Sequence, residues 1–398
     1  MIYIALPVLN ESQYIPDLLE CLKNQQFIDF EIFICVNNYE HWWQDEELKI
    51  QCRDNQRTIE YLQGVTDFKL TIIDKSSPSR GWSTKKGGVG HARKHLMDTI
   101  NEVAQKDDII VSIDADTYYP PDYLKKINDF FNENSCIGLS IPYYHKLGSE
   151  TDKLILRYEI YMRYYLLNMY RIENPYAFTA VGSAMAFPVW AYRKVGGLTP
   201  VKSGEDFYFI QKLTKTEKVC NWVDTCAYPS ARFSNRVDFG TGPALIKGNK
   251  GDWSSYPIYD YTLFDKVQQT FSLFGELYLA DIETTMDEFL KFQFKVEDVW
   301  GPLRKNYKDI DNFIKACVNK VDALRILQFL KSEYTLNPSS DSEVLKNYLM
   351  KFHTSEMDKS MTDTLYNFDF ETISLKDLSY IRDFLFNLEQ NFRILHSF

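Results

Sequence analysis

The chain has 398 residues, of which 45% are hydrophobic and 25% are charged. These proportions are typical of a globular protein and exclude a disordered, collagen-like or coiled-coil chain. The formal net charge of −10 excludes the strongly basic surface of a nucleic-acid-binding protein, so no nucleic-acid partner is expected.

Predicted strands and helices alternate in the first part of the chain. Uninterrupted apolar runs predict strands at residues 2–8, 30–36, 68–73 and 108–113. Apolar residues at helical spacing predict helices at residues 14–23 and 90–105. Because strands that alternate with helices form β-α-β units, the sequence predicts an α/β fold with a mostly parallel sheet. Ligands of such sheets bind at the carboxyl ends of the strands.

The pattern continues with three further elements and then changes. The expected order is a helix, a strand and a helix, at residues 151–172, 178–187 and 203–214. Four glycines then predict a loop at residues 240–251.

Beyond about residue 257 the apolar spacing is helical, with a break between helices at residues 337–340. We therefore expect an α/β domain at residues 1–254 and an α-helical C-terminal region of unknown role at residues 255–398. The helical region holds 16 basic and 23 acidic side chains, so it carries −7 of the net charge.

The cysteine pattern and the apolar stretches indicate the compartment. The seven cysteines are odd in number and include no C-x-x-C pair, which favours reduced thiols in a reducing compartment. No signal peptide and no apolar stretch of membrane-spanning length is visible. We expect a cytoplasmic protein with at most peripheral contact with the inner face of a membrane.

Two carboxylates follow the predicted strand at residues 108–113. Asp114 and Asp116 are separated by a single alanine. Carboxylates at this spacing suit Mg²⁺ or Mn²⁺, which also binds the oxygens of a diphosphate. The alternative is a solvated turn, in which aspartate is common.

A glycine-rich basic segment precedes the same strand. Gly87, Gly88 and Gly90 open the predicted helix, and free amides at a helix N-terminus favour an anion. The segment is neither a Walker loop nor a dinucleotide-binding fingerprint. A solvated surface loop is the alternative. The cations of the segment are Arg80, Lys85, Lys86, Arg93 and Lys94.

A second acidic pair, Glu205 and Asp206, follows Gly204 at the start of a predicted helix. The positive end of a helix favours the ionised form of such carboxylates, and an ionised carboxylate can take a proton from a hydroxyl group. Plain helix capping is the alternative.

The order of these motifs resembles that of glycosyltransferase family 2, whose catalytic domain has the GT-A fold. The similarity covers about residues 1–245. It includes the family's Pro-Val-x-Asn-Glu turn, Ala-Arg segment, Asp-Ala-Asp metal motif (the DXD motif), Glu-Asp motif and closing segment. The corresponding residues are 7–11, 90–94, 114–116, 182–206 and 230–242.

The resemblance implies a role for each matched residue. Asp206 would be the general base, with Glu205 beside it, and Asp116 would be the main metal ligand, with Asp114 near the metal and the ribose. The predicted donor-binding residues, which include two placed by the sheet topology alone, are Pro7, Asn10, Glu11, Asn37, Asp74, Arg93 and Asp114. The predicted acceptor-side residues are Gly182, Ser183, Arg232 and Arg236.

The chain departs from the family pattern at two places. Asn37 and Asn38 stand where the family usually has an acid, which leaves the recognised base open. Lys94 replaces the usual asparagine after the arginine.

The activity implied is metal-dependent, inverting transfer of a sugar of the hexosyl type. The donor would be a UDP- or GDP-type sugar, the cofactor Mn²⁺ or Mg²⁺, and the acceptor a saccharide or a lipid-linked hydroxyl, in surface polysaccharide or glycolipid synthesis. Two alternatives stay open: a nucleotidyltransferase, and a non-catalytic nucleotide-sugar-binding or scaffold protein.

Aromatic residues make up 15% of the chain and are dense at residues 143–176. Tyrosine rings there could form a platform for an acceptor sugar or touch a membrane surface. The alternative is packing against the sheet and a partner domain.

Overall fold

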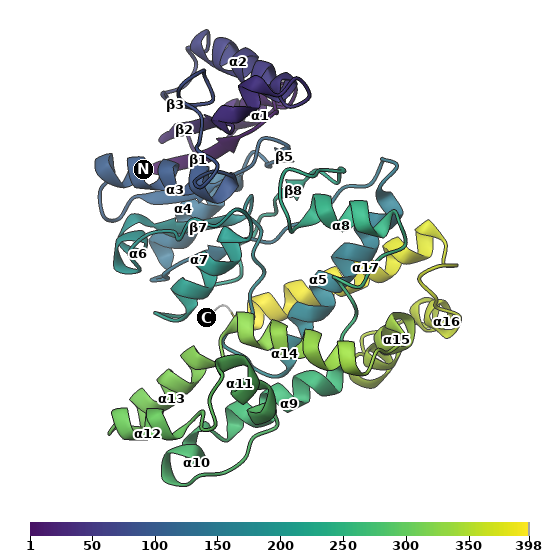
Figure 1. Cartoon of the computed structure of the whole chain (residues 1–398). Helices are drawn as coiled ribbons and strands as arrows, with labels where there is room; N and C mark the ends of the chain where they lie inside the picture. The colour runs from purple at the N-terminus through teal and green to yellow at the C-terminus, as the bar shows by residue number, and fades with distance from the viewer. Residues whose placement is uncertain (397–398) are drawn as a thin grey trace. The chain divides into compact units, whose positions relative to one another are not determined.

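The computed structural model describes residues 1–396 of the chain (Figure 1). By their contacts, these residues form two units. The first comprises Met1–Tyr158, Phe178–Trp253 and the residues from Gln390 onward. The second comprises Glu159–Ala177 and Ser254–Glu389. Helices α5 (Asp152–Arg171) and α17 (Leu375–His396) each contribute residues to both units.

The first unit contains a six-stranded sheet in the order β3-β2-β1-β4-β7-β6. Strands β3, β2, β1 and β4 are parallel, while β7 runs antiparallel to β4 and β6. This mostly parallel mixed sheet, with the many helices of the second unit, confirms the predicted α/β class with a C-terminal helical region. The strands are β1 (Ile2–Val8), β2 (Phe30–Asn37), β3 (Leu70–Lys75), β4 (Ile109–Ser112), β6 (Leu139–Ser140) and β7 (Met185–Pro188).

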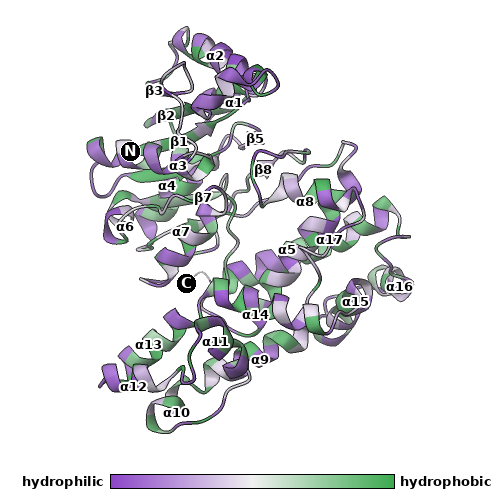
Figure 2. Cartoon of the chain, viewed as in Figure 1, coloured by the Kyte–Doolittle hydropathy of each residue, from purple (hydrophilic) through white to green (hydrophobic). Residues whose placement is uncertain are grey.

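Strand β1 is buried along its whole length, as its uninterrupted apolar run predicts. Helix α3 (Val89–Val103) packs on β1 and β2, and helix α2 (Lys49–Gln63) packs on β2 and β3. Figure 2 shows the hydrophobic residues concentrated along these strands. The core of this unit therefore lies between the sheet and its helices.

The other elements of the first unit connect the strands. They are α1 (Ile15–Lys23), η1 (Glu40–Gln44), β5 (Thr117–Tyr118), α4 (Tyr123–Glu133), α6 (Val189–Lys194), α7 (Glu205–Thr214), β8 (Tyr228–Pro229) and α8 (Thr241–Gly248). Strands β5 and β8 form a separate two-stranded antiparallel sheet.

Two sequence predictions are wrong in this unit. The predicted loop at 240–251 contains helix α8, because Ala244 and Leu245 are fully buried and their burial outweighs the low helix propensity of the glycines. Of the strand predicted at 178–187, only the last residues are in a strand, β7 (Met185–Pro188). The carbonyl groups of Gly182 and Ser183 accept side-chain hydrogen bonds, from Ser112 and Tyr119, instead of ladder hydrogen bonds.

The second unit is helical. Helix α14 (Ala323–Leu336) ends and helix α15 (Asp341–Phe352) begins on either side of the predicted break at 337–340. Its other helices are α9 (Tyr261–Ser272), α10 (Phe274–Leu279), α11 (Asp287–Phe294), α12 (Gly301–Asn306), α13 (Ile310–Lys320) and α16 (Lys359–Tyr366).

Part of the acidic surplus of this unit caps its helices. Asp260, Asp309, Asp322 and Asp358 each accept a backbone N–H at the N-terminus of α9, α13, α14 and α16, respectively. Such caps satisfy amide groups that a helix leaves unpaired. The surplus therefore has a structural role in the helical unit.

The tyrosine-rich segment is mostly buried. Tyr143, Tyr158, Tyr164, Tyr170 and Tyr176 are all at most 6% exposed. Tyr164 donates a hydrogen bond to the carbonyl of Tyr259 at 2.7 Å, inside the second unit. These contacts favour the packing interpretation for most of the segment.

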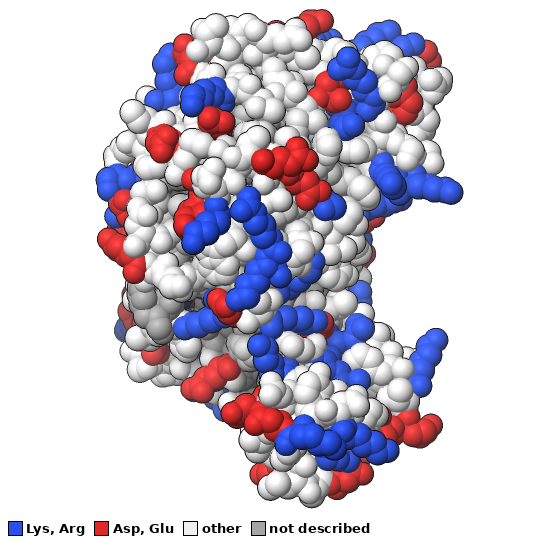
Figure 3. Space-filling model, turned by 90° about the vertical axis from the view of Figure 1, so that its left-hand side faces the viewer, with Lys and Arg blue, Asp and Glu red and all other residues white. Residues whose placement is uncertain are grey.

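Charge and hydropathy add two observations. On the face drawn in Figure 3, Lys and Arg side chains are interspersed with Asp and Glu. Within residues 1–396, no helix combines the length and the apolar character needed to cross a membrane.

Candidate active site

Three carboxylates meet at the carboxyl ends of two neighbouring strands. Glu11 follows β1, and Asp114 and Asp116 follow β4, which pairs in parallel with β1. Glu11 is buried, and the side chain of Asp116 is 16% exposed. The parallel topology thus brings together residues more than 100 positions apart in the sequence.

Two arginines pair with these carboxylates. Arg232 donates from Nε to Asp116 Oδ2 at 2.7 Å and from Nη2 to Glu11 Oε1 at 2.5 Å. Arg236 donates to the same Glu11 oxygen and, at 2.8 Å, to the carbonyl of Leu9. The arginines predicted for the acceptor side therefore contact carboxylates predicted for the metal and the donor.

A third arginine joins the two acidic motifs. Arg93, on α3, is 2% exposed. It donates from Nη2 to Asp114 Oδ1 at 2.8 Å, and from Nη1 to Glu205. Gly182 makes room for it, because a Cβ at that position would lie 2.7 Å from Arg93 Nη1. Arg93, predicted to lie near the donor, is thus occupied by two carboxylates of the protein.

The Glu-Asp motif begins helix α7 after Gly204, whose φ of 78° lies in the left-handed region that glycine adopts readily. Asp206 Oδ1 accepts the backbone N–H of Phe207 at 2.8 Å. Burial raises the pKa of Asp206, although Arg93 opposes the shift. Burial also raises the pKa of Glu205 to about 7, against the lowering effect of Arg93.

The pKa values of Glu11 and Asp114, at the ends of β1 and β4, are also raised. Burial and the nearby charge of Asp116 raise the pKa of Glu11 to about 7, against the lowering effects of Arg236 and Arg232. Burial likewise raises the pKa of Asp114, while Arg93 lowers it. Perturbed carboxylates that face one another in this way are typical of functional sites.

Pro7, Asn10 and Asn37 belong to the framework that supports this edge of the sheet. Pro7 lies within β1, in register with β2. Asn10 has a φ of 55° and donates its N–H to Asn55 Oδ1 at 2.9 Å. The Asn37 side chain donates to the carbonyl of Val8 at 2.8 Å.

Asn55 was missed by sequence reasoning. It is fully buried on α2 and also donates to the carbonyl of Asn37 at 2.9 Å and to the Asn38 side chain at 3.0 Å. Its helix is largely polar, so no apolar spacing indicated either the helix or the residue.

Asp74, at the end of β3, organises the turn that follows the strand. Its Oδ1 accepts the backbone N–H groups of Ser76 and Ser77, each at 2.9 Å. Burial raises the pKa of Asp74, but hydrogen bonds from Ser77 and Ser76 outweigh this effect and leave the pKa below its usual value. Its second oxygen lies 3.4 Å from Arg80.

The basic segment before β4 is partly neutralised by acidic neighbours. Arg80 pairs with Asp74, Arg93 is buried between carboxylates, and Lys94 pairs with Asp98 at 2.7 Å. Helix α3 begins at Val89 after Gly88, whose φ is 88°.

The residues at the site fit a hard divalent cation. Glu11 Oε2 is buried and has no hydrogen-bond partner in the structure, and Asp114 and Asp116 add carboxylate oxygens nearby. Mg²⁺ and Mn²⁺ accept one or two protein carboxylates, with the remaining ligands from diphosphate and water. In the part of the chain that the structure describes, no group of three or more His, Cys, Asp or Glu side chains is arranged around a metal position.

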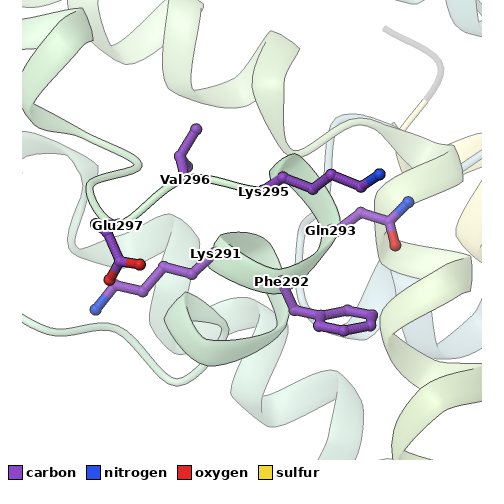
Figure 4. Close-up of a pocket in the computed structure, with 6 residues that line it drawn as sticks. All are labelled: Lys291, Phe292, Gln293, Lys295, Val296 and Glu297. Carbon is purple, nitrogen blue, oxygen red and sulfur yellow. The ribbon is translucent and has the colours of Figure 1, made fainter.

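A separate hollow of about 480 Å³ lies at the end of helix α11 in the helical unit. In Figure 4, Lys291 and Glu297 extend to one side, and Gln293 and Lys295 to the other. The hollow is lined by a single segment, residues 291–297, with one acidic side chain. The hollow therefore lacks the paired carboxylates found at the ends of β1 and β4.

Residues 109–267 match the family described as glycosyl transferase family group 2. The matched segment includes Asp114, Asp116, Glu205 and Asp206, and it confirms the resemblance inferred from the motifs. No curated protein sequence matches the chain.

Solved structures similar to this chain include two complexes with nucleotide sugars. One is Staphylococcus aureus TarS 1–349 in complex with UDP-GlcNAc, with 15% identity and a TM-score of 0.40, covering 80% of this chain and 90% of that one. The other is the mannosyltransferase PcManGT from Pyrobaculum calidifontis in complex with GDP-Man and Mn²⁺. It shows 12% identity and a TM-score of 0.40, covering 98% of this chain and 86% of that one.

Proposed function

We propose that this chain, which matches glycosyl transferase family group 2 over residues 109–267, transfers a sugar from a nucleotide-diphosphate sugar to an acceptor hydroxyl. The observation that carries the proposal is the pairing of buried Arg93 with both Asp114 and Glu205. This arginine joins the acidic motif expected at the donor to the acidic motif expected at the acceptor. One site thus contains groups suited to both halves of the reaction.

Asp116, with Asp114 beside it, would hold Mn²⁺ or Mg²⁺. When bound, such a cation neutralises the negative charge that develops on the leaving diphosphate. The carboxylate of Asp116 now accepts from Arg232, so the cation and this guanidinium compete for the same oxygen. The positive charge of Arg232 and Arg236 keeps the neighbouring carboxylates compensated in the meantime.

Asp206 is the proposed general base. Its orientation is fixed by the Phe207 N–H, and the raised pKa that burial gives Asp206 makes its carboxylate a stronger proton acceptor. The acceptor oxygen would form a bond to the anomeric carbon as the bond to the diphosphate breaks, and its proton would pass to the Asp206 carboxylate. Attack from the face opposite the diphosphate inverts the configuration, and no covalent enzyme intermediate is needed.

Two alternative functions are a nucleotidyltransferase and a non-catalytic nucleotide-sugar-binding protein. A nucleotidyltransferase usually has a glycine-rich signature after its first strand. In this chain β1 ends with Leu6-Pro7-Val8 and is followed by Leu9-Asn10, so that signature is missing. A non-catalytic nucleotide-sugar-binding protein would have no need for both acidic motifs. The finer proposal is an inverting hexosyltransferase that uses a UDP- or GDP-type donor in surface polysaccharide or glycolipid synthesis.

A screen of nucleotide sugars with Mn²⁺ tests the proposal and separates these functions. We expect at least one donor to raise the melting temperature and to be hydrolysed slowly to free sugar and nucleoside diphosphate. Binding without hydrolysis or transfer would favour a non-catalytic protein. Release of pyrophosphate from a nucleoside triphosphate and a sugar phosphate would favour a nucleotidyltransferase.

A further inference from the structure

A lysine and three tyrosines form a cluster next to the carboxylate site. Lys146 Nζ lies 4.3 Å from the ring centre of Tyr118 and 4.5 Å from that of Tyr228. The rings of Tyr118 and Tyr228 are 5.9 Å apart, and the ring of Tyr144 lies 6.3 Å from that of Tyr228. We call these four residues the tyrosine–lysine cluster.

The small sheet of β5 and β8 attaches this cluster to the proposed reaction site. Its antiparallel register places Tyr118 opposite Tyr228, and directly opposite residues project from the same face of a sheet. Strand β5 begins immediately after Asp116, and the chain that leaves β8 soon reaches Arg232, which pairs with Asp116. Both strands thus connect the cluster to the same carboxylate.

A hollow of about 290 Å³ lies beside the rings, lined by residues 146–149 and 228–231. Both walls are fixed by hydrogen bonds. The Asp152 carboxylate accepts the N–H groups of Gly148 and Ser149, each at 2.9 Å, and the Thr151 hydroxyl donates to the carbonyl of Ala231 at 2.7 Å. The hollow is therefore a formed feature of this unit.

The charge of the cluster is available to a ligand. Lys146 is exposed, and within residues 1–396 no carboxylate pairs with it. Its ammonium group is held over two ring faces instead, an attraction that limits its freedom without neutralising it. Tyr118 is 46% exposed, so its ring is accessible as well.

We propose that the tyrosine–lysine cluster is the acceptor subsite, and that it takes a saccharide that carries a carboxylate or phosphate group. This inference rests on the proposed function, in which Asp116 holds the metal. Tyr118 lies two residues after Asp116 in the chain, so an acceptor beside Tyr118 is held next to the proposed reaction site. The apolar face of a sugar packs on the exposed ring of Tyr118. Lys146 pairs with the anionic group, so the subsite favours charged acceptors over neutral ones.

Paired probes that differ in charge test this inference. Trigalacturonate is compared with its methyl ester, and glucose 6-phosphate with glucose, by titration calorimetry on the full-length protein. The two pairs distinguish a carboxylate from a phosphate as the recognised group. We expect at least one acidic probe to bind about tenfold more tightly than its neutral partner. Equal binding within both pairs, or no binding of any probe, would overturn the inference.

Variants test whether the preference for acidic probes depends on the tyrosine–lysine cluster. Lys146→Gln should abolish the preference for the acidic probe. Tyr118→Ala should weaken the binding of both the acidic and the neutral probe of a pair. Lys69→Gln is the matched control, because this exposed lysine lies just before β3 and pairs with Glu31. A preference that survives Lys146→Gln, or that Lys69→Gln removes equally, would contradict the assignment.

Hydrolysis of nucleotide sugars by the wild-type protein is measured alongside. Hydrolysis with equal binding of acidic and neutral probes overturns the subsite and leaves the proposed function standing. A charge preference that depends on Lys146, without binding or hydrolysis of any donor, supports the subsite as a saccharide site and overturns the proposed function.

Discussion

Arg232 donates from Nε to Asp116 Oδ2 at 2.7 Å, and the same guanidinium reaches Glu11. One arginine therefore compensates two carboxylates at the edge of the sheet. Partly buried carboxylates without such a partner would be costly in free energy. The arginine also occupies an oxygen that a divalent cation needs, so cation binding at Asp116 requires the guanidinium to move away.

Arg232→Gln should therefore increase the affinity for Mn²⁺ in the absence of donor, by about tenfold. The reason is that removing a competing cation leaves the carboxylates of Asp116 and Glu11 less compensated. Mn²⁺ binding is measured by electron paramagnetic resonance. Arg193→Gln serves as the control, because the side chain of this arginine donates hydrogen bonds to Asn101 and Ala104 and not to a carboxylate of the site. Unchanged or weaker Mn²⁺ binding by Arg232→Gln would show that the two do not compete.

Gly182→Ala should destabilise the first unit by about 1–3 kcal/mol, because the added methyl group forces a shift in a packed interior. Its Cβ would lie 2.7 Å from Nη1 of buried Arg93, which is held by two carboxylates. Thermal unfolding followed by circular dichroism measures the effect. Gly275→Ala on α10 is the control, since apart from its own stretch of helix no described atom lies within 4 Å of a Cβ there. Equal melting temperatures for the two variants would contradict the packing described.

Glu205 should make a contribution to stability that is lost as the pH rises from about 4.5 to about 7. Burial raises the pKa of Glu205 from 4.5 to about 7, so the folded state binds this proton more tightly than the unfolded state. The unfolded state binds fewer protons in this window, and the free energy of unfolding therefore decreases with pH. Glu11, whose pKa burial also raises to about 7, contributes in the same direction.

Urea unfolding at several pH values measures this slope. Glu205→Gln should flatten it in part, because Glu11 still titrates in the same window. Glu20→Gln, at an exposed position of α1, is the matched control and should leave the slope unchanged. An identical slope in wild type and Glu205→Gln would be inconsistent with a proton held by Glu205.

Asp206→Asn should lower the rate of sugar transfer by about 10²- to 10⁴-fold, the usual contribution of a general base. Asparagine keeps the shape of the side chain and can still accept the Phe207 N–H, so the fold and donor binding should be retained. Single-turnover transfer and donor titration separate the two effects. A folded variant with near-normal transfer would remove Asp206 from the role of base.

Much of the sheet could be predicted from the sequence, because its strands are apolar runs. Strand β1 coincides with the predicted range, and β2 and β4 differ by only a residue or two at their ends. Helix α2 could not be predicted, because it exposes a largely polar surface and buries few apolar side chains, such as Ile59 and Leu62. Periodicity alone does not detect such a helix.

The acidic residues of the candidate site could be predicted, because they occur in short local motifs. The arginine–carboxylate pairs between distant segments could not be predicted. Asp114, Asp116, Glu205 and Asp206 stand out as short acidic motifs at element boundaries. No spacing could show that Arg93 joins two of these motifs, or that Arg232 reaches across the sheet edge to Asp116. Those contacts depend on the strand order, which places β1 between β2 and β4.

The most direct test of the account is the Mn²⁺-dependent release of nucleoside diphosphate from the donor that the screen identifies, compared between wild type and Asp116→Ala. The account predicts saturable dependence on Mn²⁺ in the wild type. In the variant it predicts a rate at least about 100-fold lower, because the charge on the leaving diphosphate is no longer neutralised. Circular dichroism confirms that the variant is folded. Equal release by wild type and folded Asp116→Ala would contradict the central claim.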